Sequence, residues 1–446
     1  MPFSATAKHL LRPDTRAGRR LVAHVEPAVL QTLCTCVAIL LVTMLVTAMF
    51  WEWVGPRSRV DVGGDYGAFY EPVGRRLLED GRPIFTDGSA ATRYPPGYPA
   101  LLAALFGFAR LTGLAEASVL WGFALLATAL CGVLLFLMAR TVWPARFALA
   151  APIAWGSCPF VLWLAGIEGS ELSFCLVFYA SCYAFWTALR RPRVQPGLYL
   201  LAGVLIGVAM LIRPIAIAGG AVMVGVVWLG APAWLSQRAR LAAGALLLIG
   251  NVIAVAPWEA WVYASTGRVI MLSDGGVASI RDGLTFATTR KSFRSGVAVP
   301  ADVEAVIHNL ESRYEELRSL GDIGAALTRE AATRPLGVAK LLGLKVLRTW
   351  YGTDSHRNEA QIAGLQALYF LPVALGALIA WRRGSAPRLL VVLVVAFTLY
   401  FWAMTVLVLS IVRYMVPVLG LLFLFVPGAL AEAHRLYTTA RRPVLQ

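Results

Sequence analysis

The chain has 446 residues, of which 58% are hydrophobic and only 15% are charged. Soluble globular proteins carry about 25% charged residues, so this composition excludes an ordinary soluble domain. The formal net charge of +15 would suit a nucleic-acid partner. However, the Lys and Arg residues collect in short connections between apolar runs, as the positive-inside rule describes for membrane proteins. We therefore expect no nucleic-acid binding.

The apolar residues form continuous runs, many of them close to the length that crosses a bilayer as a helix. Only helical bundles and closed barrels satisfy backbone polar groups in lipid, and barrel strands would alternate in polarity. The sequence thus predicts an all-α, polytopic helical membrane protein with about 10–11 transmembrane helices and two extracytoplasmic loop segments. The apolar runs are 31–51, 96–112, 117–139, 146–163, 170–189, 197–212, 215–230, 240–261, 362–381, 389–410 and 413–432.

Basic residues in the two tails and in the short connections set the expected orientation. The first apolar run is too long for a cleavable signal peptide, so we expect a signal anchor with a cytoplasmic tail before it. The same rule places the other basic connections, and both termini, in the cytoplasm. These basic residues are Lys8, Arg12, Arg16, Arg19, Arg20, Arg140, Arg146, Arg190, Arg191, Arg193, Arg238, Arg240, Arg382, Arg383, Arg388, Arg435, Arg441 and Arg442.

The run 96–112 disturbs this alternation if it crosses the membrane, because the basic connection after 139 would then fall outside. It opens with Pro95, Pro96 and Pro99, and we predict an interfacial or re-entrant helix that belongs to the first outer segment. The remaining runs then give seven spans, a long outer loop and three more spans. In the alternative reading, 96–112 spans and one later run does not.

The predicted organisation has five parts, with both polar segments on the outer side. We expect the Cys residues, which all lie in apolar runs, to pack as small hydrophobic side chains, and no Cys/His spacing suggests a metal site. The parts are a cytoplasmic tail (1–30), a transmembrane module (31–261) that includes a first outer loop (52–116), an extracytoplasmic loop with interfacial helices (262–361), C-terminal transmembrane helices (362–432) and a cytoplasmic tail (433–446).

The first outer segment contains an acid that stands apart from the turn-like carboxylates around it. Asp65 follows two glycines and starts the stretch DYGAFYEPVGRRLLEDG, in which apolar residues recur at helical spacing. An Asp at a helix start serves either as a simple N-cap or as a functional acid. By contrast, we expect Glu79, Asp80 and Asp87 to be solvated, because they lie in a turn-rich stretch.

Three further charges interrupt apolar sequence at predicted helix ends. Glu171 opens the run 170–189 and lies three residues after Glu168; it is either a helix-start carboxylate next to a Ser170 cap or a functional acid. Arg213, followed by Pro214, and Arg413 each stand alone between apolar runs. Each arginine either reaches toward lipid headgroups or binds a phosphate group.

The long outer loop predicts helices of its own. A charged helical stretch covers 302–320, and the Lys and Arg spacing over 329–348 suits a helix that lies on a membrane surface.

Several stretches, taken in chain order, resemble the GT-C membrane glycosyltransferases. These are the protein O-mannosyltransferases and the bacterial aminoarabinose and polyprenyl-phosphate-sugar transferases. The matching stretches are the first outer acid with GRRLLEDG and YPPGYPALLAAL, then GIEGSEL, LIRP, APW…TGRVIMLSDGG and, near the end, RYMVP.

The resemblance implies transfer of a sugar from a polyprenyl monophosphate to an acceptor at the outer face, usually with inversion. Asp65 occupies the position of the general base, which takes a proton from the acceptor hydroxyl. Glu171 occupies the second acidic position, where it orients the acceptor or a cation. Because the leaving group is a phosphate monoester, cationic side chains can stabilise it and no metal or other cofactor is demanded. The candidates for substrate and phosphate binding are Arg93, Tyr94, Arg213, Arg413 and Tyr414.

The implied partners are a polyprenyl-phosphate sugar, a glycan, lipid or protein acceptor, and the lipids of a bacterial inner membrane. Three departures bear on the donor: Asp65 is followed by Tyr66 where the family often has Glu, Arg93-Tyr94 stands where aminoarabinose transferases have Lys, and PWEAWVYASTG lacks a common Arg. A lipid or sugar transporter or flippase is the first rival, which would place polar groups at mid-membrane and show repeats. A catalytically inactive GT-C-like subunit is the second rival.

Overall fold

The structure is a computed structural model that describes residues 27–55, 64–230, 235–285, 299–353 and 358–440. In these ranges the chain is helical, and the only strand-like pairing is an isolated bridge between Ile84 and Ala90. The all-α prediction is therefore confirmed. Most of the basic N-terminal tail and Asp61 lie outside the described residues.

Among the described residues, seven helical segments are long and apolar enough to cross a membrane, which identifies an integral membrane protein. They correspond to seven of the ten runs predicted to span. They are α1 (Pro27–Val54), α4 (Glu116–Ala139), α8 (Glu171–Leu189), α11 (Gln237–Thr266), α16 (Glu359–Arg383), α17 (Ser385–Leu407) and the segment Val412–Thr439, which contains η5 (Val412–Met415), α18 (Val416–Phe423) and α19 (Val426–Ala440).

The other three predicted spans are shorter or interrupted. The run 146–163 forms three short helices, because Pro144, Pro152 and Pro159 limit the backbone hydrogen bonds available there. The runs 197–212 and 215–230 form two shorter helices, and Pro214 ends the first of them. The pieces are α5 (Ala145–Ala148), α6 (Ala150–Ser157), α7 (Pro159–Leu164), α9 (Pro196–Ile212), η3 (Pro214–Ala216) and α10 (Gly219–Gly230).

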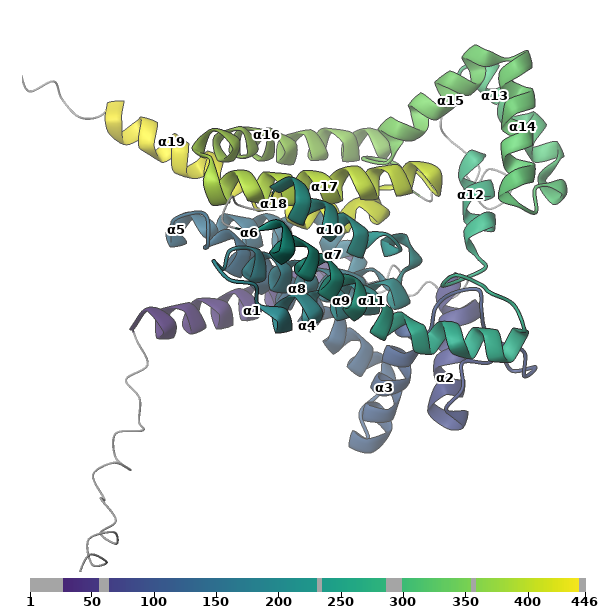
Figure 1. Ribbon diagram of the computed structural model, residues 1–446, viewed down its shortest axis with the longest axis horizontal. Coiled ribbons are helices and arrows are strands. Elements are labelled where there is room, and N and C mark those ends of the chain that lie inside the picture. The colour runs from purple at the N-terminus through teal and green to yellow at the C-terminus, as the bar shows by residue number, and fades with distance from the viewer. Residues whose placement is uncertain (1–26, 56–63, 231–234, 286–298, 354–357, 441–446) are drawn as a thin grey trace, which may run out of the picture.

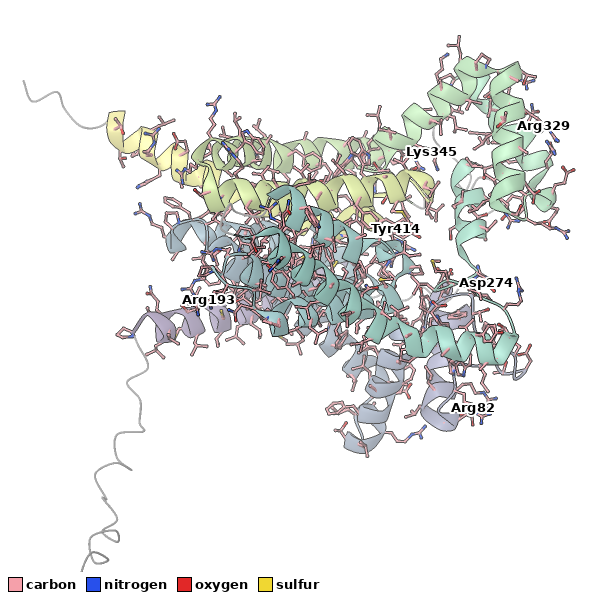
Figure 2. All side chains as sticks on the ribbon, in the orientation of Figure 1. Arg82, Arg193, Asp274, Arg329, Lys345 and Tyr414 are labelled. Carbon is pink, nitrogen blue, oxygen red and sulfur yellow. The ribbon has the colours of Figure 1, made fainter. Side chains whose placement is uncertain are left out.

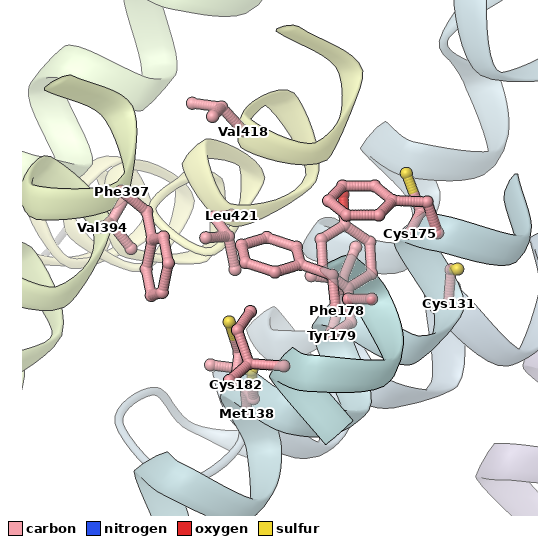
Figure 3. Close-up of a cluster of buried hydrophobic side chains, with 14 of the residues drawn as sticks. Cys131, Met138, Cys175, Phe178, Tyr179, Cys182, Val394, Phe397, Val418 and Leu421 are labelled. Carbon is pink, nitrogen blue, oxygen red and sulfur yellow. The ribbon is translucent and has the colours of Figure 1, made fainter. Parts of the chain in front are cut away.

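The bundle core is built from aromatic and small side chains of α4, α8, α17 and α18 (Figure 3). The rings of Phe178 and Phe397 meet edge to face, with centroids 5.0 Å apart. Tyr179 is fully buried, and its hydroxyl donates a hydrogen bond to the carbonyl of Pro417 at 2.9 Å. In lipid, close packing and such internal hydrogen bonds hold helices together, because water-driven burial does not act between them.

The cysteines largely follow the expected pattern of small packing side chains. Cys131, Cys158, Cys175 and Cys182 are buried and free, and three of them appear in the core close-up (Figure 3). Cys36 is half-buried, and Cys34 is exposed on α1. In a membrane-spanning helix such an exposed thiol faces lipid or a neighbouring helix.

The helices of the first outer segment run across the direction of the bundle (Figure 1). Helix α2 (Glu71–Asp80) follows the π-helical turn η2 (Tyr66–Tyr70), as the spacing predicted, and packs along α3 (Gly97–Thr112). Helix α3 has 16 residues and lies transverse to α1, α16 and α17. That 96–112 is an interfacial or re-entrant helix stays a prediction.

The segment predicted as a long outer loop forms a small helical unit beyond the end of the bundle (Figure 1). Its own core contains Val303, Val306, Ile323 and Leu341. The stretch 329–348, predicted as one surface helix, is instead divided at Pro335. The helices are α12 (Gly276–Leu284), α13 (Ala301–Ser312), α14 (Leu320–Thr333) and α15 (Pro335–Arg348), with the short turn η4 (Tyr314–Glu316).

Two basic residues of that predicted surface helix are in fact buried. Lys345 is 1% exposed and Arg348 is 3% exposed. Arg348 forms an ion pair with Glu359 at the start of α16, with 2.6 Å between Nη2 and Oε1. The expectation that the charges of 329–348 face a membrane surface was therefore wrong for these two residues, because α15 packs its C-terminal end against the bundle.

Candidate active site

Three helix ends bring a carboxylate and two guanidinium groups together. Glu171 is the first residue of α8, Arg213 is the residue at which Pro214 ends α9, and Arg413 lies in η5 after the end of α17. Arg213 Nη1 lies 2.7 Å from Glu171 Oε1, and Arg413 Nε lies 3.3 Å from the same oxygen. We call Glu171, Arg213 and Arg413 the arginine cluster; it carries two positive charges and one negative charge.

The arginine cluster is largely covered and has an aromatic side. The Glu171 side chain is 6% exposed, and those of Arg213 and Arg413 are 15% and 25% exposed. The Tyr414 ring lies 5.0 Å from the Arg213 guanidinium carbon and 5.6 Å from that of Arg413. A guanidinium has five N–H donors, so Arg213 keeps donors beyond those that meet Glu171. Because its net charge is positive, such a cluster can bind an anion.

Ser170 takes part in this cluster rather than capping α8. Its side chain makes no capping hydrogen bond, and its Oγ accepts a hydrogen bond from Arg213 Nη1 at 3.0 Å. Of the two alternatives that the sequence left open, the one with a Ser170 cap therefore does not hold. Instead, Ser170 and Glu171 both bind Nη1 of Arg213 and so hold its guanidinium group in place.

The second group of predicted residues surrounds Asp65 at the start of η2. Asp65 is exposed and makes no side-chain capping hydrogen bond, so it is not a simple N-cap. Instead, Tyr94 Oη donates a hydrogen bond to Asp65 Oδ1 at 2.9 Å. Burial raises the pKa of Tyr94, and the negative charge of Asp65 raises it further. Tyr94 thus remains a donor across the working pH range and holds one oxygen of the acid.

Aromatic rings join Asp65 and Tyr94 to the arginine cluster. Tyr70 is buried beside Tyr94, with its ring centroid 5.2 Å from that of Tyr94 and 5.0 Å from that of Tyr98. Burial raises the pKa of Tyr70, and the charges of Arg213 and Asp65 both act on it. Gly97, three residues after Tyr94, packs against the backbone of Leu211 and Ile212, which directly precede Arg213. The acid and the arginine cluster therefore lie near one another.

Arg93 belongs to the Asp65 side of the site. Its guanidinium carbon lies 5.7 Å from the centre of the Tyr94 ring. The negative charges of Asp65 and Asp282 favour the charged form of Arg93. Its side chain is exposed. Arg93 is thus placed by the structure at the edge of the site, whereas Arg213 and Arg413 form its covered part.

Two features of this region, the place of Tyr70 and the contact made by Asp274, could not be predicted from local sequence. Tyr70 appeared only as one apolar position of an amphipathic helix. Asp274, in the loop before α12, accepts a hydrogen bond from Thr92 Oγ1 at 2.9 Å and so ties the outer loop to the segment that carries Arg93 and Tyr94. Contacts between residues this far apart in the sequence leave no local pattern.

A groove of about 320 Å³ lies beside the site, between α3, α4, α7 and α8. Glu168, Ser173 and Tyr98 contribute polar groups to its lining, and Trp121 belongs to its apolar wall. Burial raises the pKa of Glu168, and the neighbouring charge of Glu71 adds to this effect. The groove therefore combines an apolar wall with a carboxyl group close to Glu171 in the chain.

Figure 2 shows Tyr414, Asp274 and Lys345 toward the same end, whereas Arg193, in one of the basic connections, lies toward the other. Among the described residues, no group of three or more His, Cys, Asp or Glu side chains could hold a metal ion. The site as a whole pairs an accessible acid with a covered, positively charged cluster.

Comparison with known proteins agrees with this architecture. Residues 94–261 match the family model described as dolichyl-phosphate-mannose-protein mannosyltransferase. The archaeal oligosaccharyltransferase AglB from Archaeoglobus fulgidus, solved with an inhibitory peptide and a dolichol-phosphate, is similar with a TM-score of 0.56 and 13% identity; the match covers 92% of this chain and 52% of AglB. The apo form of that enzyme gives a TM-score of 0.53 with 11% identity, again covering 92% of this chain and 52% of the enzyme.

ArnT from Cupriavidus metallidurans, solved with undecaprenyl phosphate, gives a TM-score of 0.42 and 17% identity over 92% of this chain and 80% of ArnT. A search of curated proteins finds no match. The chain spans about half the length of the AglB chain that it resembles. The likeness to AglB confirms the GT-C-type fold that the motifs predicted.

Proposed function

We propose that this protein transfers a sugar from a polyprenyl-phosphate donor to an acceptor hydroxyl, with inversion of the anomeric centre. The observation that carries the proposal is the convergence of Asp65 with the arginine cluster around Tyr70 in a GT-C-type fold. An accessible acid beside a covered anion site is what such a transfer needs.

Asp65 is the general base of this proposal. Its exposed carboxylate takes the proton of the acceptor hydroxyl while the hydroxyl oxygen attacks the anomeric carbon from the face opposite the phosphate. A positioned general base contributes roughly 10²- to 10⁴-fold to such a rate. Tyr94 holds Oδ1 of Asp65, which leaves the other oxygen for the proton.

The arginine cluster receives the leaving group. As the bond between the anomeric carbon and the phosphate oxygen breaks, its electron pair passes to the phosphate, where Arg213 and Arg413 stabilise the added charge. Glu171 contacts both arginines, so its task is to orient these cations rather than the acceptor. Arg93 and Tyr414 complete the substrate and phosphate site, the first at its exposed edge and the second against both guanidinium groups.

We place the site on the extracytoplasmic side of a bacterial inner membrane, with both chain termini in the cytoplasm. The site lies at the end of the bundle away from Arg193, which belongs to the basic connections (Figure 2), and basic connections favour the cytoplasm. The transverse helices α2 and α3 then lie at the outer membrane surface. The groove lined by Glu168 and Tyr98 provides room beside the site for the acceptor.

Release of free polyprenyl phosphate from a panel of polyprenyl-phosphate sugars tests the proposal. Purified protein would be supplied with a membrane extract that contains acceptors, and a double variant, Arg213→Met with Arg413→Met, would be assayed beside it. We expect release by the wild type with one class of donor and a strong loss in the double variant. Absence of release with every donor, in a preparation that binds polyprenyl phosphate, would contradict the proposal and favour a transporter or an inactive relative.

A further inference from the structure

Helix α12 connects the Asp65 side of the site with the segment that leads to the arginine cluster, because each end of the helix contacts one of them. Its N-terminal end rests on the segment that carries Arg93 and Tyr94. The backbone N–H of Asp274 donates to the Thr92 carbonyl at 3.2 Å, and Thr92 Oγ1 donates to the Asp274 carboxylate. A Cβ added at Gly275 would lie 2.7 Å from the Arg93 carbonyl oxygen. Only glycine permits this approach of the two backbones.

The C-terminal end of α12 rests on the residue that follows α17. At Gly283 an added Cβ would overlap the carbonyl oxygen of Val408, so these two backbones also touch. Val408 lies five residues before Arg413 in the chain, in the connection between α17 and η5. One short helix thus spans from the Asp65 side of the site to the segment that leads into the arginine cluster.

Lys345 closes this junction from α15. Its Nζ donates a hydrogen bond to the Gly283 carbonyl at 2.6 Å and to the Val408 carbonyl at 3.0 Å. These carbonyls belong to the last turn of α12 and to the residue that caps α17. Carbonyl groups at helix C-termini lack intrahelical partners and carry partial negative charge, so an amine donor between them satisfies both.

We propose that Lys345 is a positioning residue that holds α12 against the end of α17 and thereby sets the distance between Asp65 and the arginine cluster. The expected effect on turnover rests on the function proposed above. The expected effect on the distance across the junction does not, because this distance can be measured without turnover.

The burial of Lys345 makes this role specific to an amine. Burial lowers the pKa of Lys345 to about 7, and the positive charge of Arg348 lowers it further. A neutral amine still has two N–H donors, which equals the number of carbonyls that Lys345 meets. The junction is therefore maintained in either protonation state, whereas a side chain without N–H donors would leave both carbonyls buried and unpaired, which is costly.

Pulsed electron paramagnetic resonance on the full-length protein tests the structural claim directly. Spin labels would be attached at Thr86→Cys and Leu407→Cys, both exposed, in a background with Cys34 and Cys36 replaced by Ala. We expect Lys345→Met to broaden or lengthen the distance distribution, and Gly283→Ala to do the same by forcing α12 from Val408. Lys345→Gln, which keeps one amide donor group, serves as a milder variant if the Met variant does not fold.

The matched control is Lys340→Met, which removes a positive charge from the same helix. Lys340 is exposed and pairs with Asp302, away from the junction. We expect its distance distribution to equal that of the wild type, and Lys345→Arg to restore most of the wild-type distribution. An unchanged distribution in Lys345→Met, or an equal change in Lys340→Met, would overturn the proposal.

Kinetics then separate positioning from a general structural role. For Lys345→Met we expect kcat to fall by about tenfold or more, whereas the affinity for polyprenyl phosphate, which the arginine cluster supplies, changes less than about threefold. A proportional loss of donor binding and turnover would show that Lys345 supports the fold as a whole and would overturn the positioning role. If the wild type shows no turnover, the distance measurement still decides the inference, and only the proposed function fails.

Discussion

The two acids of the site stand in opposite surroundings. Glu171 is covered, with its side chain 6% exposed, and pairs with two arginines. Asp65 is exposed and is held by a single neutral hydroxyl group, that of Tyr94. One carboxylate is therefore engaged by cations, and the other is open to a substrate.

Because their surroundings differ, the two acids have different tasks, although a sequence motif alone would treat them as equivalent. A carboxylate between two guanidinium groups is poorly placed to take a proton from an acceptor, but it fixes those groups where a phosphate can meet them. A carboxylate at an open edge can accept a proton. We accordingly assign chemistry to Asp65 and the support of phosphate binding to Glu171.

Replacement of Asp65 should have the largest effect on turnover. We expect Asp65→Asn to lower kcat by about 10²- to 10⁴-fold, because the amide cannot accept the proton of the acceptor hydroxyl. The assay is release of free polyprenyl phosphate at saturating donor. Glu79→Gln, an exposed acid on the nearby helix α2, is the control and should retain full activity. An Asp65→Asn variant as active as that control would remove Asp65 from the mechanism.

Replacement of Glu171 should instead reduce stability. We expect Glu171→Gln to destabilise the protein by about 3 kcal/mol, because Arg213 and Arg413 would lose the carboxylate between them in a covered site. Thermal unfolding in detergent measures the effect. Glu116→Gln breaks an ion pair with Arg75 whose side chains are 41% and 43% exposed, and exposed pairs contribute only about 0–1 kcal/mol. Equal effects of the two substitutions would contradict the contrast between covered and open acids.

Removal of the Tyr94 hydroxyl should produce an intermediate loss. Tyr94→Phe keeps the ring, which packs against Phe69 with centroids 5.0 Å apart, but loses the hydrogen bond to Asp65. Such a bond contributes about 1 kcal/mol or somewhat more, so we expect kcat to fall about tenfold with little change in the unfolding temperature. A Tyr94→Phe variant with wild-type kcat would show that Asp65 needs no donor to position it.

The junction at Lys345 should give the smallest effect, a dependence of stability on pH. The folded protein holds this lysine with a pKa of about 7, lowered by burial and by Arg348, whereas the unfolded chain keeps the proton until about pH 10.4. Between these values the unfolded state binds more protons, so stability rises with pH. We expect the free energy of unfolding of the wild type, relative to that of Lys345→Met, to rise by on the order of 1 kcal/mol from pH 6.5 to pH 8.5. Thermal unfolding of both proteins at the two pH values measures this difference. A flat difference would contradict the buried state of Lys345.

Sequence reasoning located most charged residues of the site because they interrupt apolar sequence. Glu171, Arg213 and Arg413 stood out for that reason, whereas Asp65 stood out because it starts a helical pattern after two glycines. Helix α8 begins within one residue of the predicted run 170–189, whereas the helix predicted to start at Asp65 is divided into the π-helical turn η2 and helix α2, which begins at Glu71. Local sequence thus indicates helices and isolated charges well, because both depend on neighbouring residues.

The partners of those charges could not be predicted in the same way. The sequence left open whether Asp65 and Ser170 cap their helices; neither does, because each side chain is used by a residue distant in sequence, Tyr94 in one case and Arg213 in the other. Lys345 fitted the spacing of a surface helix, yet it is buried because α15 ends against α12 and α17. Tertiary contacts decide such roles, and they leave no periodic signal.

The most direct test of the division between the two parts of the site is donor affinity in two variants. The dissociation constant of polyprenyl phosphate would be measured for wild type, Asp65→Asn and Arg213→Met. We predict wild-type affinity for Asp65→Asn and at least tenfold weaker binding for Arg213→Met, because a hydrogen bond to a charged group contributes about 1.5–3 kcal/mol. Equal weakening in both variants, or unchanged affinity in Arg213→Met, would contradict the assignment of phosphate binding to the arginine cluster and of chemistry to Asp65.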